Sequence, residues 1–216
     1  MTATTPTVHI VDDDASFLAA ASRLLRASGF AVKTFSSASD FFAQRDTDAP
    51  GCVVVADLQM PGMNGLDLQS ALARTRNPLP TLFLTGQGDI PSSVRAMRGG
   101  AEDFLEKSAP KEKLLDAVKR ALARDERERE ERARQRKLRA RFDALSEREL
   151  EVLGYVVQGR LNKQIADDLG IHERTVKRHR TAITTKLGVR SVAELTRLTL
   201  DAGIFTPSAP TVPKGQ

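Results

Sequence analysis

The first half of the chain alternates short apolar runs with amphipathic stretches. Five apolar runs have the length and composition of buried β-strands; they lie at 8–11, 31–35, 52–56, 81–84 and 103–105. Apolar residues recur at helical spacing between them, which predicts helices around 17–25, 39–43, 66–72 and 94–97. Strands that alternate with helices predict an α/β domain with a doubly wound, five-stranded parallel sheet and helices on both faces.

One long helix is predicted over residues 111–142. Its first part carries enough apolar positions to dock on the sheet, namely Leu114, Leu115, Val118 and Leu122. In residues 123–137 the only apolar residues are alanines, and acids precede bases at i,i+4 spacing, which is typical of a solvated charged helix. A coiled-coil seam is the alternative, but apolar a and d positions are missing. We therefore place a first domain at 1–122 and a charged helical linker at 123–144.

The remaining chain is helical by pattern. Helices are predicted at 149–157, 162–169, 173–187 and 192–202. Ser146 and Glu149 form a capping box at the start of the first of these helices. Gly170 provides a turn between the second helix and the third. The pattern predicts an all-α four-helix domain over 145–205, followed by a proline-containing disordered tail over 206–216.

Charge is spread unevenly along the chain. Residues 1–108 contain 9 Lys or Arg against 12 Asp or Glu, residues 109–145 contain 13 against 8, and residues 146–216 contain 11 against 8. The basic second half favours nucleic acid as a partner ahead of a membrane surface. Cys52 is the single cysteine, so no intrachain disulfide forms, and we expect it to be a small buried side chain. The apolar runs are too short to span a membrane, and these features predict a cytoplasmic protein without membrane contact.

Acidic and polar side chains follow four of the predicted strands. Asp12 and Asp13 follow the first strand, and Asp57, Thr85 and Lys107 follow the third, fourth and fifth. These side chains are expected to converge, because the carboxyl ends of parallel strands meet at one edge of a sheet. Converging carboxylates repel one another unless a cation neutralises them, and oxygen ligands favour Mg²⁺. A carboxylate beside Mg²⁺ can attack a phosphoryl group and form an aspartyl phosphate.

Four stretches of the first half resemble the receiver domain of two-component response regulators. They are Val11-Asp12-Asp13-Asp14, the segment from Asp57 to Gly65, Leu84-Thr85-Gly86, and the segment from Gly100 to Lys107. The resemblance covers about residues 7–122 and implies a flavodoxin/CheY-like fold whose partner is a histidine kinase.

The resemblance also implies a role for each matching residue. Asp57 would accept the phosphoryl group. Mg²⁺ would be bound by Asp12, Asp13, Asp57 and the backbone carbonyl of Gln59. Thr85 and Lys107 would hold the phosphoryl group.

Phe104 and Ser108 flank Lys107 in the sequence, and His9 lies in the first predicted strand. Phe104 occupies the aromatic switch position of the family, although a simple core role also fits it. Ser108 departs from the family, which usually has proline after the lysine, often with a cis bond. A non-proline cis bond costs roughly 3 kcal/mol, so the Lys107–Ser108 bond is expected to be trans or strained. His9 lies inside a strand and is expected to be a strand residue rather than a ligand.

The helix predicted at 173–187 has two different faces. Val176, Ile183 and Leu187 form an apolar stripe with His179 beside it. The opposite side carries only basic and hydroxyl groups, from Arg174, Lys177, Arg178, Thr181 and Thr185. Such a face suits a helix that binds in the DNA major groove and contacts base edges. Together with the preceding helix it forms a helix-turn-helix layout. Taken alone, the face fits a plain solvated surface equally well.

The second half resembles the LuxR/FixJ/NarL-type helix-turn-helix over about residues 145–203. The matching stretches are 145–149, 159–166, 169–171, 174–179 and 186–189. The resemblance implies base contacts from Lys177, Arg178 and Thr181, and further DNA contacts from Asn162, Lys163, Arg174, Thr175, Lys186 and Arg190. His172 replaces the serine that usually caps the recognition helix, which weakens the cap. His179 is expected to pack inward.

The favoured interpretation is a FixJ-like response regulator rather than an enzyme. A histidine kinase would phosphorylate Asp57 and so control homodimerisation and binding to double-stranded DNA, with RNA polymerase as a further candidate partner. An aspartyl-phosphate hydrolase would need a second Asp at position 59, which is Gln, and a cap domain. A phosphorylation-independent DNA binder with a degenerate receiver is disfavoured by the intact acidic set.

Overall fold

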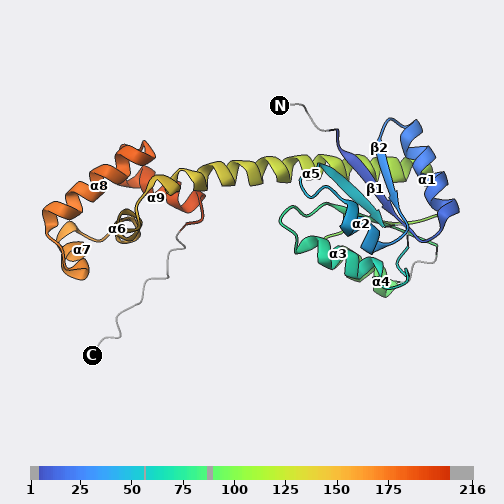
Figure 1. Cartoon of the computed structure of the whole chain (residues 1–216), viewed down its shortest axis with the longest axis horizontal. Coiled ribbons are helices and arrows are strands. Elements are labelled where there is room, and N and C mark those ends of the chain that lie inside the picture. Colours follow the sequence, from blue (N-terminus) through green and yellow to red (C-terminus); the bar gives the residue numbers. More distant parts are fainter. Residues whose placement is uncertain (1–4, 56, 87–89, 205–216) are drawn as a thin grey trace. The chain divides into compact units, whose positions relative to one another are not determined.

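The computed structural model describes residues 5–55, 57–86 and 90–204. The chain divides into two compact units, residues 1–130 and 131–216 (Figure 1). Within the described part, no helix has the length and apolar character needed to cross a membrane. The tail predicted at 206–216 lies outside the described residues, as does Ala56 at the end of the third predicted strand.

The first unit contains a parallel sheet of five strands in the order β2-β1-β3-β4-β5. The strands are β1 (Thr7–Val11), β2 (Ala31–Phe35), β3 (Gly51–Val55), β4 (Thr81–Thr85) and β5 (Asp103–Glu106). The predicted five-stranded parallel sheet is therefore confirmed. The strand order reverses between β1 and β3, where Val11 and Val55 are in register. In sheets of this kind, ligands bind at the carboxyl ends of the strands beside such a reversal.

Helices cover both faces of the sheet (Figure 1). They are α1 (Ala15–Ala27), α2 (Ala38–Gln44), α3 (Gly65–Ala73), α4 (Ile90–Arg98) and α5 (Lys111–Ala140). One apolar core joins the sheet to α1 and α5, with Ile10 and Leu25 fully buried. The other joins it to α2, α3 and α4, with Phe41 and Leu68 fully buried. Leu114, Leu115, Val118 and Leu122 of α5 all pack in or against the first core, as their spacing predicted.

Local hydrogen bonds fix the loops at the carboxyl edge of the sheet. Asp14 caps α1, because its Oδ1 accepts hydrogen bonds from the backbone N–H groups of Ser16 and Phe17 at 2.8 and 3.2 Å. The loop after β3 is closed by the Gly65 N–H, which donates to the Leu58 carbonyl at 3.1 Å. These bonds hold the segments that carry the acidic residues.

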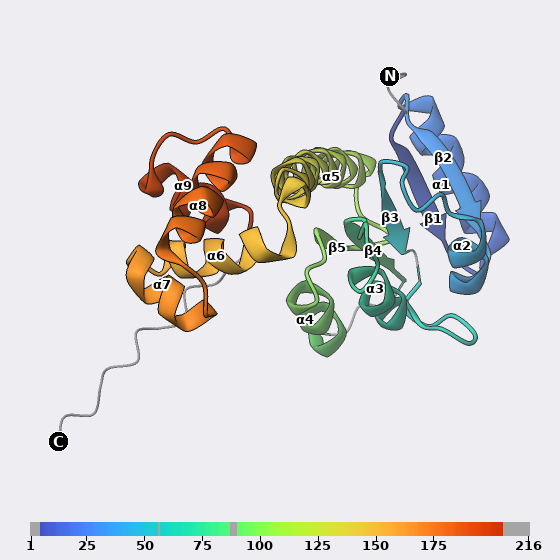
Figure 2. The same cartoon turned by 60° about the vertical axis from the view of Figure 1, so that its left-hand side comes forward.

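In the described part of the second unit, four α-helices follow the end of α5 (Figure 2). They are α6 (Glu147–Val157), α7 (Asn162–Leu169), α8 (Glu173–Leu187) and α9 (Val192–Asp201), preceded by a 3₁₀ turn, η1 (Phe142–Ala144). Their shared core includes Leu153, Ile165, Ile183 and Leu195, all almost fully buried. The all-helical architecture and the capping box of Ser146 with Glu149 are confirmed.

The long helix α5 differs from the prediction at two places. It ends at Ala140 rather than at residue 142, because Phe142 enters η1 and lies in the core of the second unit. Asp125 is not solvated: it is 1 % exposed, and its Oδ2 accepts a hydrogen bond from the Gly51 N–H at 2.9 Å. Gly51 lies 74 residues away in sequence, so the local charge pattern could not reveal this contact.

Candidate phosphoacceptor site and nucleic-acid interface

A cleft of about 1050 Å³ opens at the carboxyl edge of the sheet in the first unit. Its lining includes four of the residues predicted for the phosphoryl site, Asp57, Gln59, Thr85 and Lys107. The cleft is also lined by Asn64 on the loop after β3 and by Ser92 and Arg95 of α4. Asn64 lies inside the receiver-like segment at 57–65, whereas no sequence signal marked Ser92 or Arg95.

Asp57 is half-buried and lines the cleft two residues after the end of β3. Its Oδ1 accepts a hydrogen bond from the Gln59 backbone N–H at 2.9 Å. This short-range bond sets the direction of the carboxylate without closing the cleft over it. Asp57 is therefore both oriented and reachable, as a nucleophile must be.

Asp12 lies at the end of β1 and is fully buried. Its Oδ2 accepts a hydrogen bond from the Lys107 ammonium at 2.7 Å, and its Oδ1 accepts one from the Asp14 N–H at 2.7 Å. The same ammonium lies 4.2 Å from the centre of the Phe17 ring. A buried carboxylate requires such compensation, so Lys107 is the cation that balances Asp12 in this structure.

The donors available for a metal are carboxylate and carbonyl oxygens. Asp13 is exposed beside the buried Asp12, and Asp57 and Gln59 follow on the neighbouring strand end. Oxygen donors of this kind fit the chemistry of Mg²⁺. In the described part of the chain, however, no three His, Cys, Asp or Glu side chains are close enough together to hold a metal ion. Here Asp12 points to Lys107 instead.

Thr85 and Phe104 occupy the neighbouring strands β4 and β5. Thr85 is 3 % exposed, and its carbonyl accepts a hydrogen bond from the Lys107 backbone N–H at 2.7 Å. Phe104 is half-buried, with its ring centre 5.9 Å from that of Phe83. Thr85 and Lys107 are thus linked through the backbone, while Phe104 packs against the core on the α4 side.

The loop after Lys107 is ordered without a cis bond. The described residues contain no cis peptide, so the Lys107–Ser108 bond is trans. The Ala109 N–H donates to the Glu106 carbonyl at 2.9 Å, which closes a turn, and the Ser108 hydroxyl donates to the Glu106 carboxylate at 3.1 Å. Serine is accommodated in the position where the family usually has proline.

His9 and Cys52 are buried strand residues, as expected. The His9 ring packs between Phe35 and Phe41, with centre distances of 5.9 and 5.6 Å. Burial, together with the positive charges of Lys33 and Arg45, lowers the pKa of His9 to about 4. Burial also raises the pKa of the Cys52 thiol. Neither side chain is placed to bind a ligand in the cleft.

The two faces predicted for α8 are present in the structure. Val176, Ile183 and Leu187 are buried in the core of the second unit, and His179 beside them is half-buried. The residues of the opposite face are exposed, namely Arg174, Lys177, Arg178, Thr181 and Thr185. The core therefore fixes which side of α8 faces solvent.

Residues on this exposed face differ in how they are held. The Lys177 ammonium lies 3.2 Å from the Glu173 carboxylate, and the Thr181 hydroxyl donates to the Lys177 carbonyl at 3.1 Å. Arg174 and Arg178 form no hydrogen bond or ion pair with any described residue. These two guanidinium groups keep their donors available for a partner.

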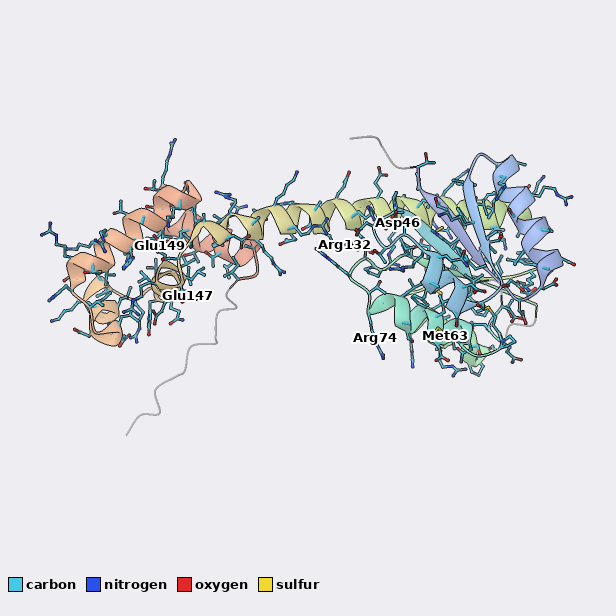
Figure 3. The ribbon with its side chains drawn as sticks, viewed as in Figure 1. Asp46, Met63, Arg74, Arg132, Glu147 and Glu149 are labelled. Carbon is cyan, nitrogen blue, oxygen red and sulfur yellow. The ribbon has the colours of Figure 1, made fainter. Side chains whose placement is uncertain are left out.

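The predicted phosphate contacts are distributed around α7 and α8. Lys163 and Arg190 are exposed, and Thr175 is half-buried. Asn162 accepts a hydrogen bond from the Arg180 guanidinium at 2.9 Å. Lys186 is 2.7 Å from Glu149 of the capping box, a contact that holds the pKa of Glu149 below its usual value. Glu149 is labelled in Figure 3.

The start of α8 has the weak cap expected from its sequence. His172 occupies the N-cap position and makes no side-chain hydrogen bond to the helix. The backbone carbonyl of His172 accepts from the Thr175 N–H at 2.8 Å. The first turn of α8 therefore depends on backbone bonds and on the core residues below it.

Two family comparisons match these two units. The sequence matches the response regulator receiver domain over residues 8–119 and the luxR family of bacterial regulatory proteins over residues 143–199. The chain belongs to the two-component response regulators that combine a receiver domain with a LuxR-type helix-turn-helix domain. It is a transcription regulator of a family that is not enzymatic, and its domains imply a histidine kinase and DNA as partners.

Relatives resemble the chain over almost its whole length. Nodulation protein W of Bradyrhizobium diazoefficiens is 42% identical over 197 residues, covering 91% of this chain and 86% of that protein. FixJ of Rhizobium meliloti is 40% identical over 205 residues, covering 94% and 98%.

Solved structures agree with this assignment. The response regulator StyR has a TM-score of 0.71 and 45% identity, covering 91% of this chain and 98% of that chain. Full-length FixJ of B. japonicum has a TM-score of 0.55 and 34% identity, covering 94% and 100%.

Proposed function

We propose that a histidine kinase phosphorylates Asp57, and that this phosphorylation controls dimerisation and sequence-specific DNA binding through α8. The observation that carries the proposal is the cleft that the oriented Asp57 carboxylate lines together with Thr85 and Lys107. The proposed DNA-binding output also supports a cytoplasmic location, because chromosomal DNA lies there.

The phosphoryl transfer uses groups already at the cleft. An oxygen of Asp57 attacks the phosphorus of a phosphohistidine, so that a P–O bond forms while the P–N bond breaks. The imidazole leaves as the neutral base after it takes up a proton. Lys107 neutralises the negative charge of the phosphoryl group, and the Thr85 hydroxyl donates a hydrogen bond to a phosphoryl oxygen. Positioning and electrostatic stabilisation of this kind account for most of the catalysis of phosphoryl transfer.

Mg²⁺ is the proposed cofactor of this site. Asp12, Asp13, Asp57 and the Gln59 carbonyl would hold it, and when bound it neutralises the carboxylates and the incoming phosphoryl group. Because Lys107 now contacts Asp12 at 2.7 Å, we expect Lys107 to leave Asp12 when it engages the phosphoryl group. Phe104, on the strand next to Thr85 and with its ring near that of Phe83, is proposed to move when Thr85 does.

An exposed apolar stripe on α4 supports dimerisation of the receiver. Ile90, Val94 and Met97 are 80, 42 and 48 % exposed, and their spacing places them on one side of the helix. Apolar side chains exposed together in this way are typical of protein contacts. We propose that phosphorylation favours pairing of this stripe with a second copy.

The DNA-binding part of the proposal uses the exposed face of α8. Lys177, Arg178 and Thr181 are proposed to contact bases, because Arg and Lys can bond guanine and Thr can contact thymine. The surrounding polar and basic residues are proposed to contact the backbone, namely Asn162, Lys163, Arg174, Thr175, Lys186 and Arg190. A dimer would present two such helices to a two-fold DNA site.

The proposal is tested with beryllofluoride, a phosphoryl mimic, on the full chain. Sedimentation is expected to show a shift from monomer to dimer, and gel shift to show about tenfold tighter binding to a duplex selected from a random pool, equal to about 1.4 kcal/mol. Val94→Asp is expected to block the dimer, whereas Val192→Asp, with a similar 43 % exposure on α9, is the matched control. An unchanged sedimentation profile and unchanged DNA affinity would refute the switch.

A further inference from the structure

The last turn of α5 belongs structurally to the second unit. Leu138 packs against the core of that unit, and Phe142, just beyond the end of α5, is buried in it. These two apolar side chains hold the intervening backbone against α8 and α9. The arginines between them, Arg139 and Arg141, are therefore placed before any partner binds.

Arg141 reaches the C-terminal end of α8. A helix leaves its last carbonyl groups without partners inside the helix, and these groups carry partial negative charge. In α8, Gly188 adopts φ +62° and its N–H bonds to the carbonyls of Thr184 and Thr185. The Leu187 carbonyl accepts a hydrogen bond from the Arg141 guanidinium instead. A charged group just beyond the end of α5 thus completes the cap of α8.

Arg139 makes the equivalent contact at the end of α9. Its Nε donates to the Ala202 carbonyl at 2.9 Å. The next residue, Gly203, has φ +61°, and a Cβ added there would lie 3.3 Å from the Arg139 guanidinium. The α9 end is therefore held by the same kind of charge-assisted cap.

The sequence spacing of the two arginines explains how one turn reaches two helices. Arg141 lies one residue beyond α5 but keeps helical backbone angles, with φ −63° and ψ −30°. Residues two apart in a helical backbone differ by about 200° around its axis, so their side chains leave on opposite sides. Arg139 and Arg141 can therefore extend to different neighbours. Guanidinium groups also suit this task, because they stay charged and donate several hydrogen bonds in a fixed geometry.

We infer that Arg139 and Arg141 are positioning residues for the recognition helix. Arg139 in the last turn of α5 fixes the C-terminal end of α9, and Arg141 just beyond α5 fixes that of α8. Together they set the angle at which the exposed face of α8 is presented. This inference rests on the proposed role of α8 in reading DNA. Arg141 acts through α8, and its guanidinium is engaged with Leu187 rather than offered to phosphate.

The test compares specific with non-specific DNA binding in the full chain. The probes are a duplex selected by the wild-type protein from a random pool and a scrambled duplex of equal length. Arg141→Ala is expected to weaken binding to the selected duplex about tenfold and to leave the scrambled duplex almost unaffected. Arg141→Lys keeps a charged hydrogen-bond donor, and it is expected to restore part of the preference for the selected duplex over the scrambled one. Arg136→Ala is the matched control, because Arg136 is exposed on α5, five residues before Arg141, and bonds to no described residue.

Salt dependence separates positioning from phosphate contact. Each lost phosphate contact lowers the slope of log affinity against log salt by about 0.9. The inference predicts an unchanged slope in Arg141→Ala. Equal losses of affinity for both duplexes, with a reduced salt slope, would assign Arg141 to phosphate contact and overturn the inference. An unchanged ratio of the affinities for the two duplexes would also overturn it.

Hydrogen exchange tests the contact without any DNA. In Arg141→Ala, the amides of Gly188 and Val189 are expected to exchange faster while those of α6 keep the wild-type rate. Equal rates at the end of α8 in both proteins would refute the cap. Faster exchange throughout the unit would show general destabilisation and would also count against positioning. If the wild-type protein selects no duplex, the proposed sequence-specific DNA binding is wrong. The exchange rates still show in that case whether Arg141 caps α8.

Discussion

The two functional regions of this protein are built in different ways. The cleft of the receiver collects Asp57, Thr85 and Lys107 from separate strand ends, and its companion Asp12 is 95 residues from Lys107 in sequence. The recognition face lies on the single helix α8, and its residues are exposed. The cleft therefore depends on the whole sheet, whereas the face depends on the orientation of one helix.

This difference predicts which function is lost when a residue in each region is substituted. A change beneath α8 should disturb DNA binding and leave phosphorylation intact. A change in the sheet should disturb the receiver and leave the helical unit folded. The two units are separate compact bodies in the contact pattern of the chain, which makes such independent failure testable.

The largest effect is expected from Ile183→Ala. Ile183 is fully buried beneath the recognition face, and removing a buried Ile side chain costs about 4 kcal/mol. Chemical denaturation followed by circular dichroism should show early unfolding of the helical unit. Labelling with acetyl phosphate should stay at the wild-type level. Loss of labelling together with DNA binding would show that the two regions are not independent.

His9 offers a matching test in the receiver. Its pKa in the folded protein is about 4, below the ordinary value of 6.5, so the unfolded chain binds a proton more readily between these pH values. The stabilising contribution of neutral His9 is therefore present above pH 6.5 and decreases as pH falls towards 4. From pH 7 to pH 5 the receiver should lose about 2 kcal/mol of stability.

His9→Phe should remove this part of the pH dependence. Phenylalanine fits the aromatic surroundings formed by Phe35 and Phe41 and carries no titrating group. Denaturant midpoints of both proteins at pH 7 and pH 5 provide the measurement. The same pH dependence in both proteins would mean that His9 does not make the receiver acid-sensitive.

The smallest effect distinguishes two exposed arginines of α8. Arg178→Ala is expected to weaken binding to a selected duplex by about 1.5 kcal/mol and to relax the preference at one base position. Arg174→Ala is expected to weaken binding to all duplexes equally and to reduce the salt slope by about 1. Titrations at several salt concentrations check both. Identical behaviour of the two variants would contradict their separate assignment.

The sequence was sufficient for the features that depend on local pattern. The five strands follow from apolar runs, and the buried stripe of α8 follows from the spacing of Val176, Ile183 and Leu187. The capping box at Ser146 follows from two residues three positions apart. Each of these features is determined within one element, so a single segment contains the necessary information.

Contacts between distant segments could not be derived in the same way. Asp125 belongs to a stretch that has the pattern of a solvated helix, yet it is buried against Gly51. The strand-end pattern predicted that Lys107 and Asp12 would converge, but their direct 2.7 Å contact depends on the fold. Arg139 and Arg141 likewise look like members of a charged helix until α8 and α9 are placed against them.

The central claim is that Asp57 is the phosphoacceptor, and intact-mass measurement after incubation with acetyl phosphate and Mg²⁺ tests it most directly. The wild-type chain should gain one phosphoryl group and Asp57→Asn should gain none. Asp67→Asn, which alters another carboxylate lining the same cleft, should be labelled like the wild type. Labelling of Asp57→Asn at the wild-type level, or loss of labelling in Asp67→Asn alone, would contradict the account.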